Sequence, residues 1–268
     1  MKKDYKIAFI DIDWTILNHE DGHYFDMPSI EALKKAQDQG VLIYIVTARP
    51  YASVRGTGLF EYLTPDGIIT NNGGLTFIND EIVFQNTIPP EVMKEVLRVA
   101  NKHNVTLQLS MIKDRYFSRK PNQYVKNYFS IYYEDWPKVK HQAYDNVSDI
   151  IAFIPEKYDA KMMEELPSSI NYYRYDNYGV NISCFKNKKG DAVIKLLNYL
   201  NIAKENALAI GDSQDDISMF EEVGFSVAMG NSKDDSVKEK ATIVADTIDN
   251  HGVALIVANL LFWIISSL

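Results

Sequence analysis

Cysteine and positive charge are both scarce in this sequence of 268 residues. Cys184 is the only cysteine, which excludes an intramolecular disulfide and a metal site built from several cysteines, so we expect a reducing, cytoplasmic setting. The formal net charge is −8 and the isoelectric point is near 5.2, which argues against a surface for nucleic acid or an anionic membrane. The oligomeric state is left open by the sequence.

Long apolar runs are also absent. The most apolar segment, Val253 to Ile265, is too short to span a bilayer and Asn259 interrupts it, so we expect a helix packed on a sheet. Phe262 to Ile265 could instead extend into a contact with a partner. At the other end, Asp11 follows a very short apolar run, which is not typical of a secretory signal. The hydrophobic content of 46% supports one large core or two moderate ones.

The most informative stretch runs from Lys6 to Leu17. Ile7 to Ile10 is typical of a strand buried on both faces of a parallel sheet, and Asp11 and Asp13 follow it. Ligands of such sheets bind beyond the carboxyl ends of the strands, and two carboxylates on one side of a strand need a cation between them. Mg²⁺ fits, because no histidine or cysteine stands nearby to favour zinc. The alternative is a pair of turn or capping carboxylates; a calcium loop is excluded, because Ile16 stands where that loop needs glycine.

Other predicted strands also end in polar side chains. One apolar run is followed by Thr47, and a later run is followed by Asp212, with Asp215 and Asp216 opening the next helix. If the sheet is parallel, these side chains share an edge with the first acidic pair. Each also has a simpler interpretation: Thr47 as a hydrogen-bonded strand-end hydroxyl, and Asp215 and Asp216 as acids favoured in the first turn of a helix.

Lys189 begins a predicted amphipathic helix over residues 189–200. In the simpler interpretation it is an exposed lysine of the first turn, and Lys186 and Lys188 lie close enough to take its place. Gly190, directly after it, favours Lys189.

The remaining pattern alternates helices and strands. Ser29 is a suitable N-cap for a helix that Gly40 ends, and a weaker helix is predicted over residues 51–63, where two glycines occur. A hairpin is predicted over residues 75–84. Three histidines lack the spacing of metal ligands and are expected in loops: His19, His23 and His251.

The middle of the chain has a different character. A helix starts at Pro89-Pro90, residues 105–112 alternate like a half-exposed strand, and tyrosines are concentrated from Arg115 to Tyr178. This α+β pattern, with an antiparallel sheet, predicts a domain inserted over residues 83–186. Basic residues here could contact a leaving group or simply be solvated: Lys113, Arg115, Arg119, Lys120 and Arg174.

Taken in order, these residues resemble the haloacid dehalogenase-like (HAD) phosphatase superfamily, whose motifs are Asp-x-Asp-x-Thr, a strand-end Thr or Ser, a Lys, and Gly-Asp-x-x-(Asn/Asp)-Asp. The matching residues are Asp11, Asp13 and Thr15, then Thr47, then Lys189, then Gly211, Asp212, Asp215 and Asp216. Asn72-Gly73, Lys189-Gly190 and Ala228 to Asn231 extend the resemblance to the Cof-type sugar-phosphatase branch. The resemblance implies an α/β fold, with a Rossmann-like parallel-sheet HAD core over residues 1–82 and 187–268. Residues 83–186 would form an inserted cap that determines substrate specificity.

The resemblance also implies a role for each residue. Asp11 would be the nucleophile that forms an aspartyl-phosphate, and Asp13 would protonate the leaving alcohol and then deprotonate the attacking water. Mg²⁺ would be held by Asp11, the backbone carbonyl of Asp13 and Asp212, with Asp216 in an outer position. The phosphoryl group would lie among the following: Thr47, Lys189, the backbone amides of Ile12 and Ala48, and Asp215.

Three residues depart from the family pattern. Trp14 stands where glycine is usual, and a bulky residue there either excludes a strained backbone or narrows access to the site. Ala48 replaces a common glycine. Asp215 replaces the more usual asparagine, and its added negative charge would tighten metal binding or weaken phosphate binding.

We therefore expect a Mg²⁺-dependent phosphomonoester hydrolase that acts on small phosphorylated metabolites, sugar phosphates in particular. One alternative is a phosphomutase or phosphotransferase, in which a second hydroxyl replaces water. Another is a non-hydrolytic protein that binds phosphorylated ligands on the same fold. The intact acids argue against that last alternative, because binding alone does not need a nucleophile together with an acid–base group.

Overall fold

The computed structural model describes residues 4–20, 22–132, 136–140, 144–174, 177–184 and 187–261. The chain divides into two compact units. The first comprises Met1–Ala48, Leu59–Val83 and Asn187–Leu268, and the second comprises Arg49–Gly58 and Phe84–Lys186. The second unit thus includes a short segment near residue 50 besides the long middle stretch.

The first unit is built on a sheet of eight strands in the order β16-β15-β14-β1-β4-β5-β6-β7. The strand bounds in chain order are β1 Ile7–Ile10, β4 Leu42–Val46, β5 Gly67–Thr70, β6 Leu75–Ile78, β7 Glu81–Gln85, β14 Ala207–Gly211, β15 Phe225–Ala228 and β16 Ile243–Val244. From β16 to β5 all neighbours are parallel, and β6 turns back antiparallel to β5. The α/β class with a parallel sheet is therefore confirmed.

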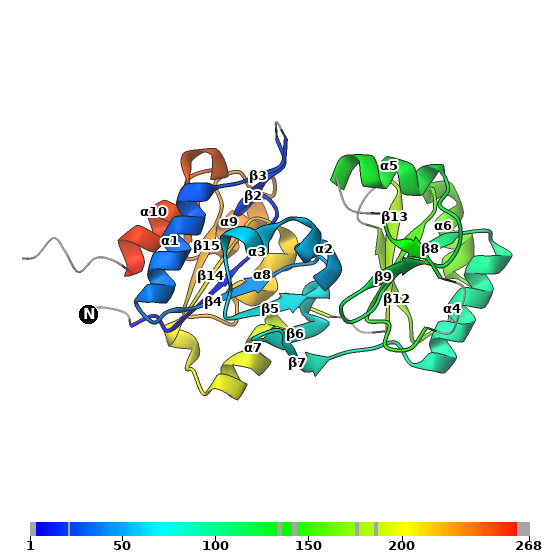
Figure 1. Ribbon diagram of the computed structural model, residues 1–268, viewed down its shortest axis with the longest axis horizontal. Coiled ribbons are helices and arrows are strands. Elements are labelled where there is room, and N and C mark those ends of the chain that lie inside the picture. The colour runs from blue at the N-terminus through cyan, green and yellow to red at the C-terminus, as the bar shows by residue number, and fades with distance from the viewer. Residues whose placement is uncertain are drawn as a thin grey trace, which may run out of the picture. The chain divides into compact units, whose positions relative to one another are not determined.

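Helices cover both faces of this sheet (Figure 1). Their bounds are α1 Met27–Asp38, α3 Leu59–Tyr62, α7 Lys189–Leu200, α8 Gln214–Phe220, α9 Asp235–Lys240 and α10 Gly252–Leu261. Alternate residues of β1 and β4, such as Phe9 and Tyr44, are buried together with apolar residues of α7, α8 and α9. On the other face α1 packs against α10. Burial on both faces explains why β1 is apolar throughout.

The first helix after β1 does not begin where the sequence predicts. Helix α1 begins at Met27 with Asp26 in the N-cap position, so the prediction of Ser29 as N-cap is wrong. The buried Ser29 hydroxyl instead donates to the Asp26 carboxylate and accepts from the Ala254 amide, 3.1 Å away, which joins α1 to α10. Gly40 follows the helix with φ of 87°, as predicted.

The predicted helix over residues 51–63 is two short helices, α2 Tyr51–Gly56 and α3 Leu59–Tyr62. Gly58 lies between them with φ of 78°, a conformation that a helix cannot continue through. The predicted hairpin is present as β6 and β7, and Asn79 and Asp80 adopt φ of 49° and 64° in its turn. Positive φ at both turn residues is what a two-residue hairpin turn of type I′ requires.

The second unit has its own sheet, in the order β10-β9-β8-β11-β13-β12. The strands are β8 Thr106–Ser110, β9 Arg115–Phe117, β10 Lys138–Val139, β11 Asp149–Phe153, β12 Asn171–Arg174 and β13 Gly179–Ser183, and the helices of the middle stretch are α4 Pro90–Lys102, α5 Gln123–Tyr132 and α6 Glu156–Met163. The pairings are antiparallel except between β10 and β9.

Strand β8 corrects the expectation of a half-exposed strand, since all five of its residues are buried. Leu107 and Leu109 pack into the cluster under α4 and α6. On the opposite side Gln108 lies between its cross-strand partners Phe117 and Ile151, which belong to the aromatic cluster under α5. An inner strand with helices on both sides has no face left for water.

Among the described residues, every helix is too short or too polar to cross a bilayer. The apolar segment near the carboxyl end forms α10, and Val253 and Val257 on it are fully buried. Phe262 to Ile265, considered for a partner contact, lie outside the described residues.

Candidate active site

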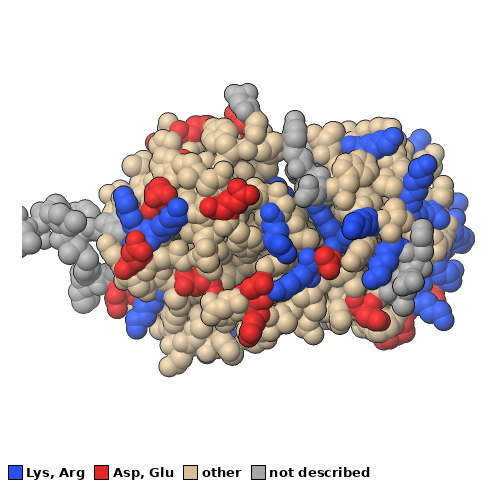
Figure 2. All heavy atoms as spheres, in the orientation of Figure 1, with Lys and Arg blue, Asp and Glu red and all other residues tan. Residues whose placement is uncertain are grey.

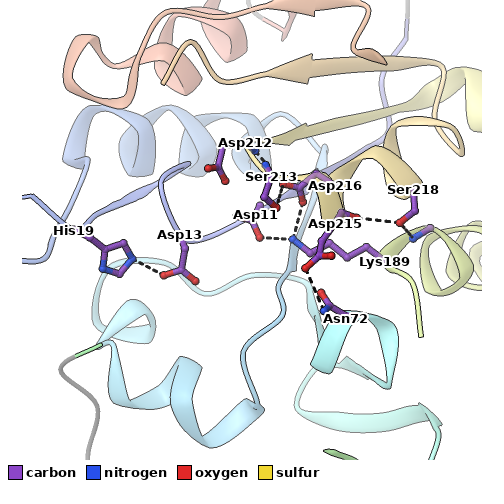
Figure 3. A network of polar contacts seen from close by, with 11 residues as sticks. Asp11, Asp13, His19, Asn72, Lys189, Asp212, Ser213, Asp215, Asp216 and Ser218 are labelled. Atoms are coloured by element: carbon purple, nitrogen blue, oxygen red, sulfur yellow. Dashed lines mark hydrogen bonds and ion pairs between the residues drawn. The ribbon is translucent and has the colours of Figure 1, made fainter. Parts of the chain in front are cut away.

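The site lies at the carboxyl ends of the central strands of the first unit. Strand β1 lies between β14 and β4, and all three run parallel. Asp11 directly follows β1, Thr47 follows β4, and Asp212 follows β14. Parallel neighbours end at the same edge of a sheet, so residues far apart in the chain meet there (Figure 3).

Lys189 connects two of the acids. Its Nζ lies 2.6 Å from Asp11 Oδ1 and 2.6 Å from Asp216 Oδ1, and the lysine side chain is only 2% exposed. Lys189 is the first residue of α7 and Lys188 is its N-cap, while Lys186 lies outside the described residues. A Cβ on Gly190 would overlap the Ser218 carbonyl of α8, so a glycine is needed for the close approach that brings Lys189 inward.

Asp216 is more than an acid favoured by the start of a helix. It is fully buried, and its Oδ2 accepts hydrogen bonds from the amides of Asp212 and Ser213, each at 2.9 Å. The Ser213 hydroxyl donates to the same oxygen at 3.0 Å. Ser213 and Asp216 also form a capping box at the start of α8, in which the side chain of each accepts from the backbone amide of the other. Asp216 therefore fixes the loop that carries Asp212 while its other oxygen binds Lys189.

Three carboxylates come close enough to share one cation. Oxygens of Asp11, Asp212 and Asp216 all lie within 4.8 Å of one another. Burial raises the pKa of Asp11 well above its usual range; Lys189 opposes this rise, and the three other aspartates of the site add to it. Burial and then the charge of Asp216 raise the pKa of Asp212 to about 8.

The charge balance at this point fits a divalent metal. Burial alone would lower the pKa of Lys189, but the carboxylates of Asp11 and Asp216 outweigh it and raise that pKa. One ammonium group faces three carboxylates, so the ionised site has excess negative charge. A hard cation with oxygen ligands, such as Mg²⁺, suits this donor set.

The Asp13 side chain contacts a histidine, His19. Its Oδ1 lies 2.5 Å from Nε2 of His19, and Figure 3 shows it directed at that imidazole. His19 Nδ1 lies 2.6 Å from Nδ1 of His23. His19 lies in a loop, as predicted, between β2 Leu17–Asn18 and β3 Tyr24–Phe25. The sequence holds no clear signal of the contact, because six residues and a chain reversal separate the partners.

Trp14 adopts a left-handed backbone conformation, with φ of 60°. The expectation that a bulky residue excludes a strained backbone here is wrong, because such a conformation costs an L-residue about 1–2 kcal/mol and is adopted nonetheless. The Trp14 carbonyl accepts from Asn231 Nδ2 at 2.8 Å, and Lys233 Nζ lies 5.4 Å from the centroid of the indole ring. The second interpretation, that Trp14 narrows access, stays a prediction.

The remaining predicted residues are Thr47, Asp215, Ile12 and Ala48. Thr47 is fully buried; its amide donates to the Ile69 carbonyl at 2.9 Å, and its own carbonyl accepts from the Asn72 amide at 3.1 Å. Asn72 also donates through Nδ2 to Asp215 Oδ2 at 3.3 Å, which places Asp215 at the exposed side of the site. Ile12 is buried.

Ala48 is exposed, at the point where the first unit ends. The next residue in the chain is Arg49. Its Nη1 donates to Ser53 Oγ at 3.1 Å, and both residues are buried in the second unit. This contact gives Arg49 a structural partner of its own.

Known proteins resemble the chain over almost its whole length. Residues 8–257 match the family model of haloacid dehalogenase-like hydrolases. Phosphoglycolate phosphatase 1 of Saccharolobus solfataricus is 27% identical over 96% of both chains. The 5-amino-6-(5-phospho-D-ribitylamino)uracil phosphatase YcsE of Bacillus subtilis is 26% identical over 94% of both. A solved sugar phosphatase of HAD subclass IIB is 26% identical, with a TM-score of 0.78 over 95% of this chain and 98% of that one. The chain therefore belongs to the haloacid dehalogenase-like hydrolases, as a phosphatase of that family.

Proposed function

We propose that the protein hydrolyses phosphomonoesters of small metabolites, sugar phosphates in particular, through an aspartyl-phosphate on Asp11 and with Mg²⁺ bound. The observation that carries this proposal is the buried ion pair between Asp11 and Lys189, 2.6 Å long, beside two further carboxylates. A structural ion pair alone would not need Asp212 and Asp216 beside it, because the extra negative charge is costly when buried.

Asp11 would attack phosphorus with a carboxylate oxygen. Lys189 favours the ionised form of Asp11 and presents positive charge where the phosphoryl oxygens gather negative charge. The hydroxyl of Thr47 and the amides of Ile12 and Ala48 would complete the set of donors for those oxygens. Removing one such donor typically costs about 2.7–4 kcal/mol of barrier.

Asp13 would serve as the acid–base group. It would give a proton to the leaving alcohol when the phosphorus–oxygen bond breaks, and take one from the water that attacks the phosphoenzyme. The residues that would hold Mg²⁺ are Asp11, Asp212 and the Asp13 carbonyl, with Asp216 behind them. When bound, Mg²⁺ would reduce the repulsion between the anionic nucleophile and the phosphate dianion.

The substrate class rests on the relatives. Their names specify phosphoglycolate, a ribityl phosphate and sugar phosphates, which share a phosphate ester on a small polar body. We assign catalysis to residues 1–82 and 187–268, and recognition of the leaving group to residues 83–186. Within that segment Arg119 is bonded to Asn104 and Arg174 to the Ile154 carbonyl, so these two arginines help to hold the fold.

The test is a panel of phosphorylated metabolites and p-nitrophenyl phosphate, assayed with Mg²⁺ and with a chelator. We expect phosphate release by the wild type with Mg²⁺, none by Asp11→Asn, and normal release by Asp191→Asn, which changes an exposed acid of the same unit. Borohydride reduces an acyl phosphate to an alcohol, so quenched wild-type enzyme should contain homoserine at position 11. Isomer formation without phosphate release would indicate a mutase. Tight binding of a phosphosugar without turnover would indicate a binding protein.

A further inference from the structure

A short hairpin next to the site carries His19, which contacts Asp13, and His23, which contacts His19. Its strands are β2 Leu17–Asn18 and β3 Tyr24–Phe25, and His19 and His23 lie in the segment between them. His19 Nε2 lies 2.5 Å from Asp13 Oδ1, and the His19 side chain is 11% exposed while that of Asp13 is 32% exposed. Asp13 thus has a side accessible to solvent and a side held by a shielded imidazole.

The imidazole is itself held from two directions. The His23 ring meets the His19 ring edge-on, with centroids 4.6 Å apart, and the two Nδ1 atoms lie 2.6 Å apart. The Trp14 indole lies against the same imidazole, with centroids 5.2 Å apart. The left-handed backbone at Trp14 is what directs an indole there, where a glycine would leave the His19 ring without this neighbour.

We propose that His19 is a positioning residue for the acid–base step, and this rests on the proposed role of Asp13. By binding one carboxyl oxygen, His19 restricts the rotation of the Asp13 side chain and holds the carboxyl in one orientation. Proton transfer to a leaving oxygen is sensitive to placement on the ångström scale, so a fixed carboxyl is a better acid than a rotating one. Residues that orient reacting groups from behind act in the same way at metal sites.

The proton balance of this step involves Asp13 and not His19. The carboxyl gives its proton to the leaving oxygen as the phosphorus–oxygen bond breaks, and the resulting carboxylate later accepts a proton from the water that attacks phosphorus. His19 keeps its hydrogen bond to Asp13 throughout. Trp14 and His23 contribute by keeping the imidazole in place.

The test uses three aryl phosphates whose leaving groups need increasing help from an acid: p-nitrophenyl, phenyl and 4-methoxyphenyl phosphate. A nitrophenolate leaves readily without a proton, whereas a methoxyphenolate does not. The variants are His19→Phe, which keeps a ring beside Trp14 but has no donor, and His19→Gln, which restores an N–H. His103→Gln, in the second unit, is the control. The melting temperature of each variant is measured alongside kcat/KM, which reports the first phosphoryl transfer.

For His19→Phe we expect kcat/KM with 4-methoxyphenyl phosphate to fall about tenfold or more, and with p-nitrophenyl phosphate to stay within about threefold of wild type. His19→Gln should recover a large part of the loss, and His103→Gln should match wild type with all three esters. An equal fall with all three esters, or no fall at all, would overturn the role of His19 while leaving the phosphatase assignment intact. If the wild type hydrolysed none of the esters faster than Asp11→Asn, the proposed function would fail, and the role of His19 with it.

Discussion

The two units of this protein carry opposite charge. The first unit has 24 acidic residues against 12 lysines and no arginine, a formal charge of −12, whereas the second has 16 basic against 12 acidic residues, a charge of +4. Figure 2 shows lysine and arginine side chains gathered over the elements of the second unit on the visible face. Negative charge is thus concentrated in the unit that holds the clustered carboxylates of Asp11, Asp212 and Asp216, and positive charge in the unit to which we assign recognition of an anionic substrate.

The units also differ in how they bury a carboxyl group. In the first, Asp11 and Asp216 share Lys189, which compensates part of their buried negative charge. In the second, Asp149 on β11 accepts from the neutral amide of Asn181 at 2.6 Å, and burial raises the pKa of Asp149 to about 7 although Asn181 opposes the rise. The ammonium group of Lys189 favours the ionised form of its carboxylate partners, whereas the amide beside Asp149 leaves that carboxyl largely protonated below about pH 7.

The largest expected effect comes from breaking the compensated network. Lys189→Met should lower kcat/KM by at least about 100-fold, because a donor to the phosphoryl oxygens is lost. It should also lower the free energy of unfolding by about 3–5 kcal/mol, because two buried carboxylates lose their partner. Steady-state kinetics and urea unfolding measure the two effects. Unchanged stability would show that Asp11 and Asp216 are not compensated by this lysine.

A smaller effect is expected from adding the metal. Mg²⁺ at 100 times its dissociation constant should stabilise the wild type by about 2.7 kcal/mol, seen as a rise in melting temperature. Asp212→Asn should remove most of this rise, whereas Asp149→Asn should keep it. An equal response of both variants would place the cation outside the group of Asp11, Asp212 and Asp216.

The smallest effect concerns the second unit alone. The pKa of Asp149 is raised on folding, from 3.8 to about 7, so the native state holds this proton more tightly than the unfolded state. This contribution to stability is complete below about pH 4, falls as the pH rises through 7, and is constant above. Asp149→Asn mimics the protonated form, so its melting temperature relative to wild type should increase between pH 5 and 8, by the equivalent of about 1 kcal/mol or more. A difference that does not vary with pH would contradict the raised pKa, and kcat should not change.

Much of the first unit could be predicted from the sequence because its strands are buried on both faces. An apolar run followed by a polar side chain marks the end of such a strand, which locates Asp11, Thr47 and Asp212 directly. Helix α7 has the predicted bounds, and Gly190 identified the inward-facing lysine because only glycine permits the contact with α8. Each of these sequence signals is local, and each is compatible with one structure only.

Other features depend on contacts that no local sequence pattern predicts. The bond between His19 and Asp13 requires the β2–β3 hairpin and a particular backbone at Trp14, and neither follows from residue types. Strand β8 alternates polar and apolar residues, yet Gln108 is buried because aromatic neighbours on the adjacent strands cover it. Helix α5 was missed because its tyrosines are as typical of strands as of helices.

The position of β1 in the sheet has a consequence for synthesis of the chain. Ile7 pairs with Leu42 of β4 on one side and with Ala207 of β14 on the other. During translation one edge of β1 must therefore wait, unpaired, until β14 has been synthesised. At the usual speed of translation this wait lasts on the order of 10 s. During it the nascent chain exposes an unpaired apolar strand, which is the kind of edge that joins other chains. The ribosome-bound protein therefore needs protection from aggregation until β14 emerges and closes the sheet.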